Sequence, residues 1–198
     1  MCLEKVRSGT PEHNWEKWYQ LKHGDVYVEA GAFWGRYGRI ASRKVGETGK
    51  VILIEPSPTN IVVIETVIRE ENLANVTIIK KAIWIHRGKK KFCVYGNPAG
   101  HRLAASSDEE VVEVEADTID NILDELNLSQ VSLLAADVEG AEVELVKSCE
   151  RHLEDKKILN IAIGAYHNPL NPREIIDYLT SKGYCDIKYE DGVVFGHV

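Results

Sequence analysis

Short apolar runs alternate along this chain with segments whose apolar residues recur at helical spacing. The runs predict buried strands, and the spaced positions predict helices that cover them. Strands are expected at 26–30, 51–55, 75–81, 131–137 and 157–163, with helices between them. The pair Ser57–Pro58 is typical of a helix start, with serine as the N-cap and proline at the first helical position. This order predicts an α/β fold, a doubly wound and mostly parallel seven-stranded sheet of Rossmann-like type.

Two regions depart from this rhythm. Residues 82–95 and 111–116 alternate as extra strands, which predicts a hairpin and loop insertion at about 83–116. Such an insertion is either a place where substrate specificity is built or an ordinary surface loop. The last segment, CDIKYEDGVVFGHV, holds two strands so close in sequence that only an antiparallel hairpin can join them.

Length and composition fit one globular domain. The 198 residues predict a helical N-terminal extension over 1–24 and a single domain over 25–198. The formal charge of −7 argues against binding a polyanion such as nucleic acid. The four cysteines form no closely spaced pair, no apolar run is long enough to span a membrane, and the start lacks a signal-peptide core. A cytoplasmic protein that does not associate with membranes is expected.

The segment DVYVEAGAFWG predicts a ligand-binding turn. A strand runs into a turn with Gly31 and Gly35, and the neighbouring strand ends in Glu55, which can accept hydrogen bonds from both hydroxyls of a ribose. The glycine spacing misses the dinucleotide fingerprint, and the acid Glu29 would repel a pyrophosphate. Glu29 suits a cofactor with an amino group and a sulfonium, which is S-adenosylmethionine. The alternative is a structural turn in which Glu55 is a solvated strand end.

A second candidate segment is AADVEGAE. Asp137 lies at a strand end, Glu139 starts the next helix, and Gly140 permits close approach of a ligand. In open α/β sheets the ligand lies beyond the carboxyl ends of the strands, where these side chains are expected. The alternative is helix capping, with Asp137 as an N-cap and Glu139 as a first-turn acid, and both roles can hold together.

These segments, in order with IEPSP, NVTIIKKAI and DTIDNIL, resemble the FkbM family of class I S-adenosylmethionine-dependent methyltransferases, from about residue 24 to about residue 168. The resemblance implies methyl transfer to a hydroxyl of a small metabolite or sugar. It also implies that Glu55 contacts the ribose and that adenine packs near Ala82. The expected cofactor-binding residues are Glu29, Gly31, Ala32, Phe33, Gly35, Glu55, Pro56, Ala82 and Asp137.

The chain departs from the family at two positions. Phe33 stands where the family usually has asparagine, which tolerates left-handed backbone better, so either the turn is reshaped or Phe33 packs under it. Gly164 stands where an acid is expected, and His167 follows three residues later.

The expected catalytic residues are Asp137, Glu139 and His167. A hydroxyl acceptor benefits from a general base, and His167 is preferred because an unperturbed histidine titrates near neutrality, with Asp137 or Glu139 as substitutes. No acid occurs between Ile163 and Glu174, so too few carboxylates are expected for magnesium, and metal independence is predicted.

Three other functions are weighed against this one. A non-catalytic cofactor-binding or interaction module is motivated by Phe33 and Gly164. An RNA methyltransferase would share the fold but not the acidic charge. A nicotinamide-dependent oxidoreductase is disfavoured by the glycine spacing. The sequence leaves the oligomeric state open.

Overall fold

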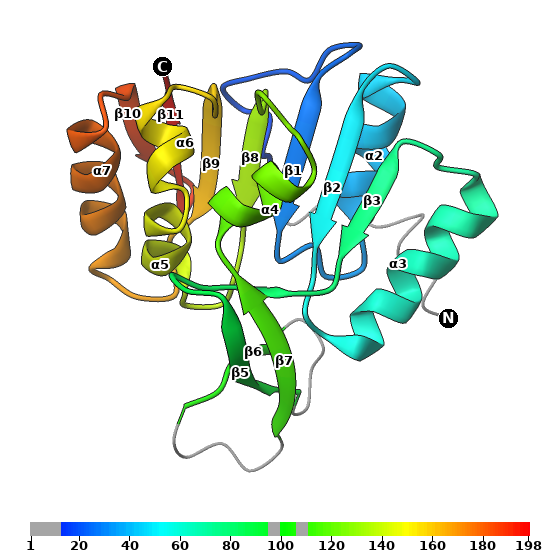
Figure 1. Cartoon of the computed structure of the whole chain (residues 1–198). Coiled ribbons are helices and arrows are strands. Elements are labelled where there is room, and N and C mark those ends of the chain that lie inside the picture. Colours follow the sequence, from blue (N-terminus) through cyan, green and yellow to red (C-terminus); the bar gives the residue numbers. More distant parts are fainter. Residues whose placement is uncertain (1–12, 95–99, 106–110) are drawn as a thin grey trace.

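The computed structural model describes residues 13–94, 100–105 and 111–198. Its main sheet has seven strands in the order β10-β11-β9-β8-β1-β2-β3 (Figure 1). The strands are β1 (Val26–Ala30), β2 (Lys50–Ile54), β3 (Val76–Ile79), β8 (Leu133–Ala136), β9 (Asn160–Gly164), β10 (Cys185–Glu190) and β11 (Val193–His197). Strand β11 pairs antiparallel with both β9 and β10, and the other pairs are parallel. The predicted sheet with its C-terminal antiparallel hairpin is therefore confirmed.

Helices cover both faces of this sheet (Figure 1). They are α2 (Arg36–Val45), α3 (Pro58–Glu71), α4 (Ile119–Glu125), α5 (Glu142–Lys147), α6 (Glu150–Glu154) and α7 (Asn171–Ser181). Helix α3 starts as predicted, because the Ser57 hydroxyl accepts from the Asn60 backbone N–H and Pro58 takes the first helical position. The helix expected between residues 137 and 157 is instead two short helices, α5 and α6, with Cys149 between them.

Successive side chains of the central strands point into two different cores, as the pleat requires. Val28 packs with residues of α4, α5, α6 and α7 on one face. Tyr27, its neighbour, packs with α2, α3 and the N-terminal segment on the other. Because strands β1, β2, β8 and β9 are buried on both faces, they read in the sequence as nearly continuous apolar runs.

The insertion forms a second sheet with the order β4-β7-β5-β6. Its strands are β4 (Ala82–Ile83), β5 (Gly88–Cys93), β6 (Arg102–Leu103) and β7 (Val111–Asp117). Strands β4, β5 and β7 fall where extra strands were predicted, whereas β6 lies in the stretch that was expected to be a loop. Figure 1 shows this small sheet beyond the carboxyl ends of β1, β2, β3 and β8. Residues 95–99 and 106–110 of the predicted loop lie outside the described residues.

The buried carboxylate of Asp117 fixes the small sheet to the main domain. It accepts from Lys81 Nζ at 2.8 Å, Arg87 Nε at 2.9 Å and Asn121 Nδ2 at 2.8 Å. Burial alone would raise the pKa of Asp117, but these donors lower it to about 2. The insertion is thus attached at its base while its strands extend over the end of the main sheet.

The expectation of a helical N-terminal extension is wrong for residues 13–24, which form turns and irregular segments. The rest of that prediction, residues 1–12, lies outside the described residues. Glu16 holds this segment against α2: its buried carboxylate accepts from the Leu21 backbone N–H at 2.7 Å, from Lys44 Nζ at 2.6 Å and from the Tyr37 hydroxyl. The bonds to Tyr37 and Lys44 hold this segment in place without a helix. Within the described part of the chain, no helix is long and apolar enough to cross a membrane.

Candidate active site

A cavity open to solvent lies at the carboxyl ends of the central strands. Residues from β1, β2, β8, the small sheet and the N-terminal segment line it. They are His13, Trp15, Glu29, Gly31, Ala32, Phe33, Arg36, Tyr37, Ile54, Glu55, Pro56, Asn60, Lys81, Ala82, Ile83, Phe92, His101, Leu103, Asp137, Val138, Glu139 and Ala141.

The turn after β1 requires glycine at position 31. Gly31 has φ +78°, and a Cβ built there would lie 1.8 Å from the backbone oxygen of Asp137. The close approach that the sequence predicted for a ligand is therefore an approach between the ends of two adjacent strands. It brings the turn and Asp137 to the same wall of the cavity.

The turn is left-handed at Phe33, with φ 52°, even though phenylalanine replaces asparagine there. The turn therefore keeps this conformation despite the substitution, and the Phe33 ring stacks on Trp34 with centroids 4.5 Å apart. The Phe33 backbone N–H donates to Glu55 Oε2 at 2.8 Å. Glu139, also on the cavity wall, has φ 54°. Left-handed backbone is rare outside glycine, and two of the described residues that adopt it, Phe33 and Glu139, lie on the cavity wall.

Glu55 is buried at the end of β2, with its side chain held in place from several sides. Its Oε1 accepts from the Ser57 backbone N–H at 2.9 Å and from Asn60 Nδ2 at 3.4 Å. Burial raises the pKa of Glu55 to about 7, and the bonds from Ser57 and Phe33 oppose that rise. Each carboxylate oxygen can accept two hydrogen bonds, so Oε1 is fully used and Glu55 Oε2, which already accepts from Phe33, can receive one ligand hydroxyl.

Glu29 is only 6% exposed and lines the same cavity. Its Oε2 is buried and has no hydrogen-bond partner among the described residues. Burial raises the pKa of Glu29 to about 8, against the opposing effect of donors that include Trp15. A buried carboxylate oxygen without a donor is costly, and a cationic group placed beside it relieves that cost.

Asp137 follows the end of β8, and its side chain is hydrogen-bonded to the aromatic side chains of His13 and Tyr166. Its Oδ2 receives the Tyr166 hydroxyl at 2.5 Å and lies 3.1 Å from His13 Nε2. Burial alone would raise the pKa of Asp137, but the bonds from His13 and Tyr166 and the charge of His167 lower it. Its Oδ1 is buried and has no hydrogen-bond partner among the described residues. Asp137 is therefore an ionised carboxylate on the cavity wall.

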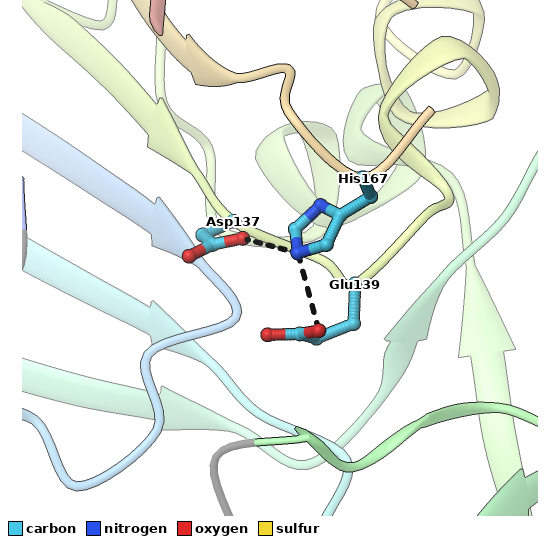
Figure 2. Close-up of side chains that lie close together, drawn as sticks. All are labelled: Asp137, Glu139 and His167. Carbon is cyan, nitrogen blue, oxygen red and sulfur yellow. Dashed lines mark ion pairs between the residues drawn. The ribbon is translucent and has the colours of Figure 1, made fainter. Parts of the chain in front are cut away.

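His167 lies among three carboxylates, two of which, Asp137 and Glu139, are drawn with it in Figure 2. Its Nε2 lies 3.1 Å from Glu139 Oε2 and 3.6 Å from Asp137 Oδ1, and its Nδ1 lies 2.9 Å from Glu142 Oε1. Partial burial lowers the pKa of His167, but the bonds to Glu139 and Glu142 outweigh this effect and raise it to about 10. His167 is therefore an imidazolium at neutral pH, with both nitrogens donating, and in this state it cannot accept a proton.

Asp137, Glu139 and His167 each offer one ligand atom, and these atoms lie within 4.8 Å of one another (Figure 2). Carboxylate and imidazole ligands of this kind suit several divalent metal ions. In this structure the positive charge between the two carboxylates comes from the His167 imidazolium. The prediction of metal independence counted only carboxylates as ligands and did not consider His167.

The structure brings most of the sequence-predicted residues together. Glu29, Gly31, Ala32, Phe33, Glu55, Pro56, Ala82, Asp137 and Glu139 line the cavity. Two predicted residues do not. Gly35 is the N-cap of α2, where a Cβ would lie 3.3 Å from the Ile64 side chain, and His167 sits behind Asp137 and Glu139.

Sequence reasoning missed more than half of the residues that line the cavity. His13 and Trp15 reach it from the N-terminal segment, and His101 comes from the insertion, where its Nδ1 lies 2.9 Å from the Ser57 hydroxyl. No local pattern marks these three. Tyr166 directly precedes His167 after β9, so its place at a strand end was a usable signal.

Residues 25–185 match the sequence profile of the methyltransferase FkbM domain. The match covers most of the chain, which therefore belongs to the FkbM methyltransferase family. Proteins of this family use S-adenosylmethionine as the methyl donor. No curated protein matches the chain significantly.

Solved structures share this fold. The FkbM methyltransferase from Methylobacillus flagellatus is 17% identical with a TM-score of 0.70, and the match covers 94% of this chain and 48% of that one. A SAM-dependent O-methyltransferase from Thermotoga maritima is 15% identical with a TM-score of 0.58, covering 96% and 60%. Fibrillarin from Aeropyrum pernix, solved with natively bound S-adenosyl-L-methionine, is 19% identical with a TM-score of 0.54, covering 88% and 67%. This chain thus spans about half the length of the M. flagellatus enzyme.

Proposed function

We propose that this protein transfers the methyl group of S-adenosylmethionine to a hydroxyl of a small metabolite or sugar. The observation that carries the proposal is one cavity whose wall holds three buried or half-buried carboxylates in different environments, Glu29, Glu55 and Asp137. The fold and the family support the reaction class.

The cavity fits the chemistry of this cofactor. Glu55 ends the strand next to the glycine turn, the position from which a carboxylate reaches the ribose, and its Oε2 can accept a ribose hydroxyl. Glu29 Oε2, without a hydrogen-bond partner among the described residues, can take a cationic group of the cofactor beside it, and the ionised Asp137 carboxylate adds negative charge to the same wall. Ala82 and Pro56, together with Phe92 of the small sheet, provide apolar surface for the adenine.

When bound, the cofactor supplies an electrophilic methyl group, so the protein mainly has to align donor and acceptor. Positioning of this kind can contribute about 7 to 11 kcal/mol to the lowering of a barrier. The small sheet lies beyond the strand ends (Figure 1) and contributes Phe92 and Leu103 to the cavity wall, with His101 beside them. A wall on this side supports a small acceptor. The net charge of −7 supports an acceptor other than nucleic acid.

We further propose that the protein acts in the cytoplasm. The thiols of Cys93 and Cys149 are buried and free, which suits a reducing compartment.

Replacing Glu55 with glutamine tests the cofactor site. The variant keeps the shape of the side chain but loses the charge that strengthens hydrogen bonds from the ribose. We expect the affinity for S-adenosylhomocysteine, measured by isothermal titration calorimetry, to fall by about 1.5 to 3 kcal/mol, roughly 10- to 150-fold. The control is Glu47→Gln, an exposed residue outside the cavity, which should bind as the wild type does. Equal affinity of the Glu55 variant and the wild type would contradict the ribose assignment.

We also propose that the reaction needs no metal, because the imidazolium of His167 provides the positive charge between Asp137 and Glu139. Replacing His167 with glutamine leaves the fully buried Glu142 without its charged partner, so we expect a loss of about 3 kcal/mol of unfolding free energy. Magnesium should leave the melting temperature of the wild type unchanged and raise that of the variant. A magnesium-dependent rise in the wild type would show that the ion displaces the imidazolium, against the proposal.

A further inference from the structure

We propose that His13, from the N-terminal segment, is the general base that takes the proton of the acceptor hydroxyl. This inference rests on the proposed function, because it assigns a residue to the proton that O-methylation must remove. His13 lines the cavity and contacts Asp137, and it lies outside the segment that matches the family, which begins at residue 25.

The hydrogen bonds around Asp137 fix which nitrogen of His13 carries a proton. The Tyr166 hydroxyl has one proton, and it donates that proton to Asp137 Oδ2 at 2.5 Å. His13 Nε2 lies 3.1 Å from the same carboxylate oxygen and 3.0 Å from the Tyr166 oxygen, and both of these atoms can only accept from it. Nε2 must therefore be the donor. In the neutral ring the lone pair is therefore on Nδ1.

The arrangement matches what a histidine base needs. An ionised carboxylate on one ring nitrogen fixes the tautomer and stabilises the imidazolium that forms when the other nitrogen takes a proton. Asp137 provides that carboxylate. His167, which the sequence favoured as the base, has both ring nitrogens directed at carboxylates and has no nitrogen left for an acceptor.

Packing holds His13 in place at the cavity. Its ring lies 4.5 Å from the ring of Trp15 and 5.3 Å from that of Tyr166, measured between centroids. Trp15 is 4% exposed, and the next residue, Glu16, is bonded to α2 by its buried carboxylate. The N-terminal segment is thereby anchored within three residues of His13, so the ring is positioned by fixed neighbours.

The transfer step moves one methyl group and one proton. The acceptor oxygen forms a bond to the methyl carbon as the bond between that carbon and the sulfonium breaks, and the electron pair of the broken bond stays on sulfur. The proton of the acceptor hydroxyl moves to Nδ1 of His13. The imidazolium keeps its hydrogen bond to Asp137 and then releases the proton to solvent.

The first measurement is the tautomer. Long-range proton–nitrogen correlation spectra are recorded at neutral pH on protein with nitrogen-15-labelled histidine, in complex with S-adenosylhomocysteine. The His13 signals are assigned as those that disappear in the His13→Gln variant. We expect a protonated Nε2 and an unprotonated Nδ1. A proton on Nδ1, in either the other tautomer or the imidazolium, would overturn the proposal.

The second measurement is turnover. Methyl-tritiated S-adenosylmethionine is incubated with the small-molecule fraction of a cell extract, and incorporated tritium is counted. His13→Gln keeps an N–H for Asp137 but lacks the Nδ1 lone pair, so we expect turnover to fall about 100-fold or more. Affinity for S-adenosylhomocysteine should stay within about threefold of the wild type. The matched control is His23→Gln, an exposed histidine of the same segment whose Nδ1 bonds Thr48, and it should turn over normally.

The outcomes separate the two proposals. If wild type binds S-adenosylhomocysteine and transfers tritium while His13→Gln does so at an undiminished rate, His13 is not the base and the proposed function stands. If the wild type binds no S-adenosylhomocysteine or transfers no tritium, the proposed function fails. The spectra still determine the protonation of His13 in that case, and they are recorded without the ligand if it does not bind.

Discussion

Gly31→Ala is expected to destabilise the protein by about 2 to 5 kcal/mol. The methyl group would lie 1.8 Å from the backbone oxygen of Asp137, so the ends of β1 and β8 would have to separate. Left-handed backbone at an alanine adds about 1 to 2 kcal/mol, and overpacking typically adds about 1 to 3 more. A domain of this size has about 5 to 15 kcal/mol of stability, so the loss is severe. Urea denaturation followed by circular dichroism measures it.

Gly140→Ala is the matched control for this variant. Gly140 also has a left-handed backbone, with φ +102°, but a Cβ there would meet no atom within 4 Å. The control should therefore lose only the conformational part, about 1 to 2 kcal/mol. Equal losses in both variants would show that the contact with Asp137 relaxes freely, and the close approach of β8 would then not be the reason for glycine at position 31.

Glu29→Gln is expected to stabilise the ligand-free protein above neutral pH. Below about pH 4.5 the carboxyl group is protonated in both states and has no effect. Between 4.5 and 8 the unfolded chain releases a proton that the folded protein keeps, because burial raises the pKa of Glu29 to about 8. The unfolding free energy of the wild type therefore falls as pH rises through this window, by about 1.4 kcal/mol per pH unit from this group. The variant lacks that slope, and denaturation at several pH values compares the two.

The same variant should bind the cofactor poorly. A cation beside Glu29 favours its ionised form, so binding at neutral pH releases a proton. Calorimetry of S-adenosylmethionine binding in two buffers of different ionisation enthalpy should detect this release in the wild type and in Glu47→Gln. In Glu29→Gln we expect no such release and a roughly 10- to 150-fold weaker affinity. Proton release that persists in the variant would assign the effect to another group.

The fold was predictable because its signals are local. Strands such as 26–30 and 131–137 are buried on both faces, so they appear in the sequence as apolar runs. The pair Ser57–Pro58 marks the start of α3. The N-terminal segment was mispredicted because its structure depends on Glu16 bonding to residues of α2. Side-chain bonds between distant parts of the chain leave no periodic pattern in either segment.

The candidate site was predictable to the extent that it lies at strand ends. Glu29, Glu55 and Asp137 directly end or follow strands, and parallel topology brings such positions together. His13 meets Asp137 across 124 residues, a contact that no spacing rule can find. The role expected for His167 also changes in three dimensions, because its neighbours Glu139 and Glu142 determine its protonation.

Asp137 contacts residues on both sides of residue 25, where the match to the family begins. The matched region starts at residue 25, yet the partners of this carboxylate include His13, twelve positions upstream. A recombinant fragment cut at that boundary would retain every strand of the central sheet and lose His13 and Trp15 from the cavity wall. It would also lose Trp15 and Leu21 from the core that packs on α2, so a negative assay on such a fragment could reflect missing packing as well as a missing His13.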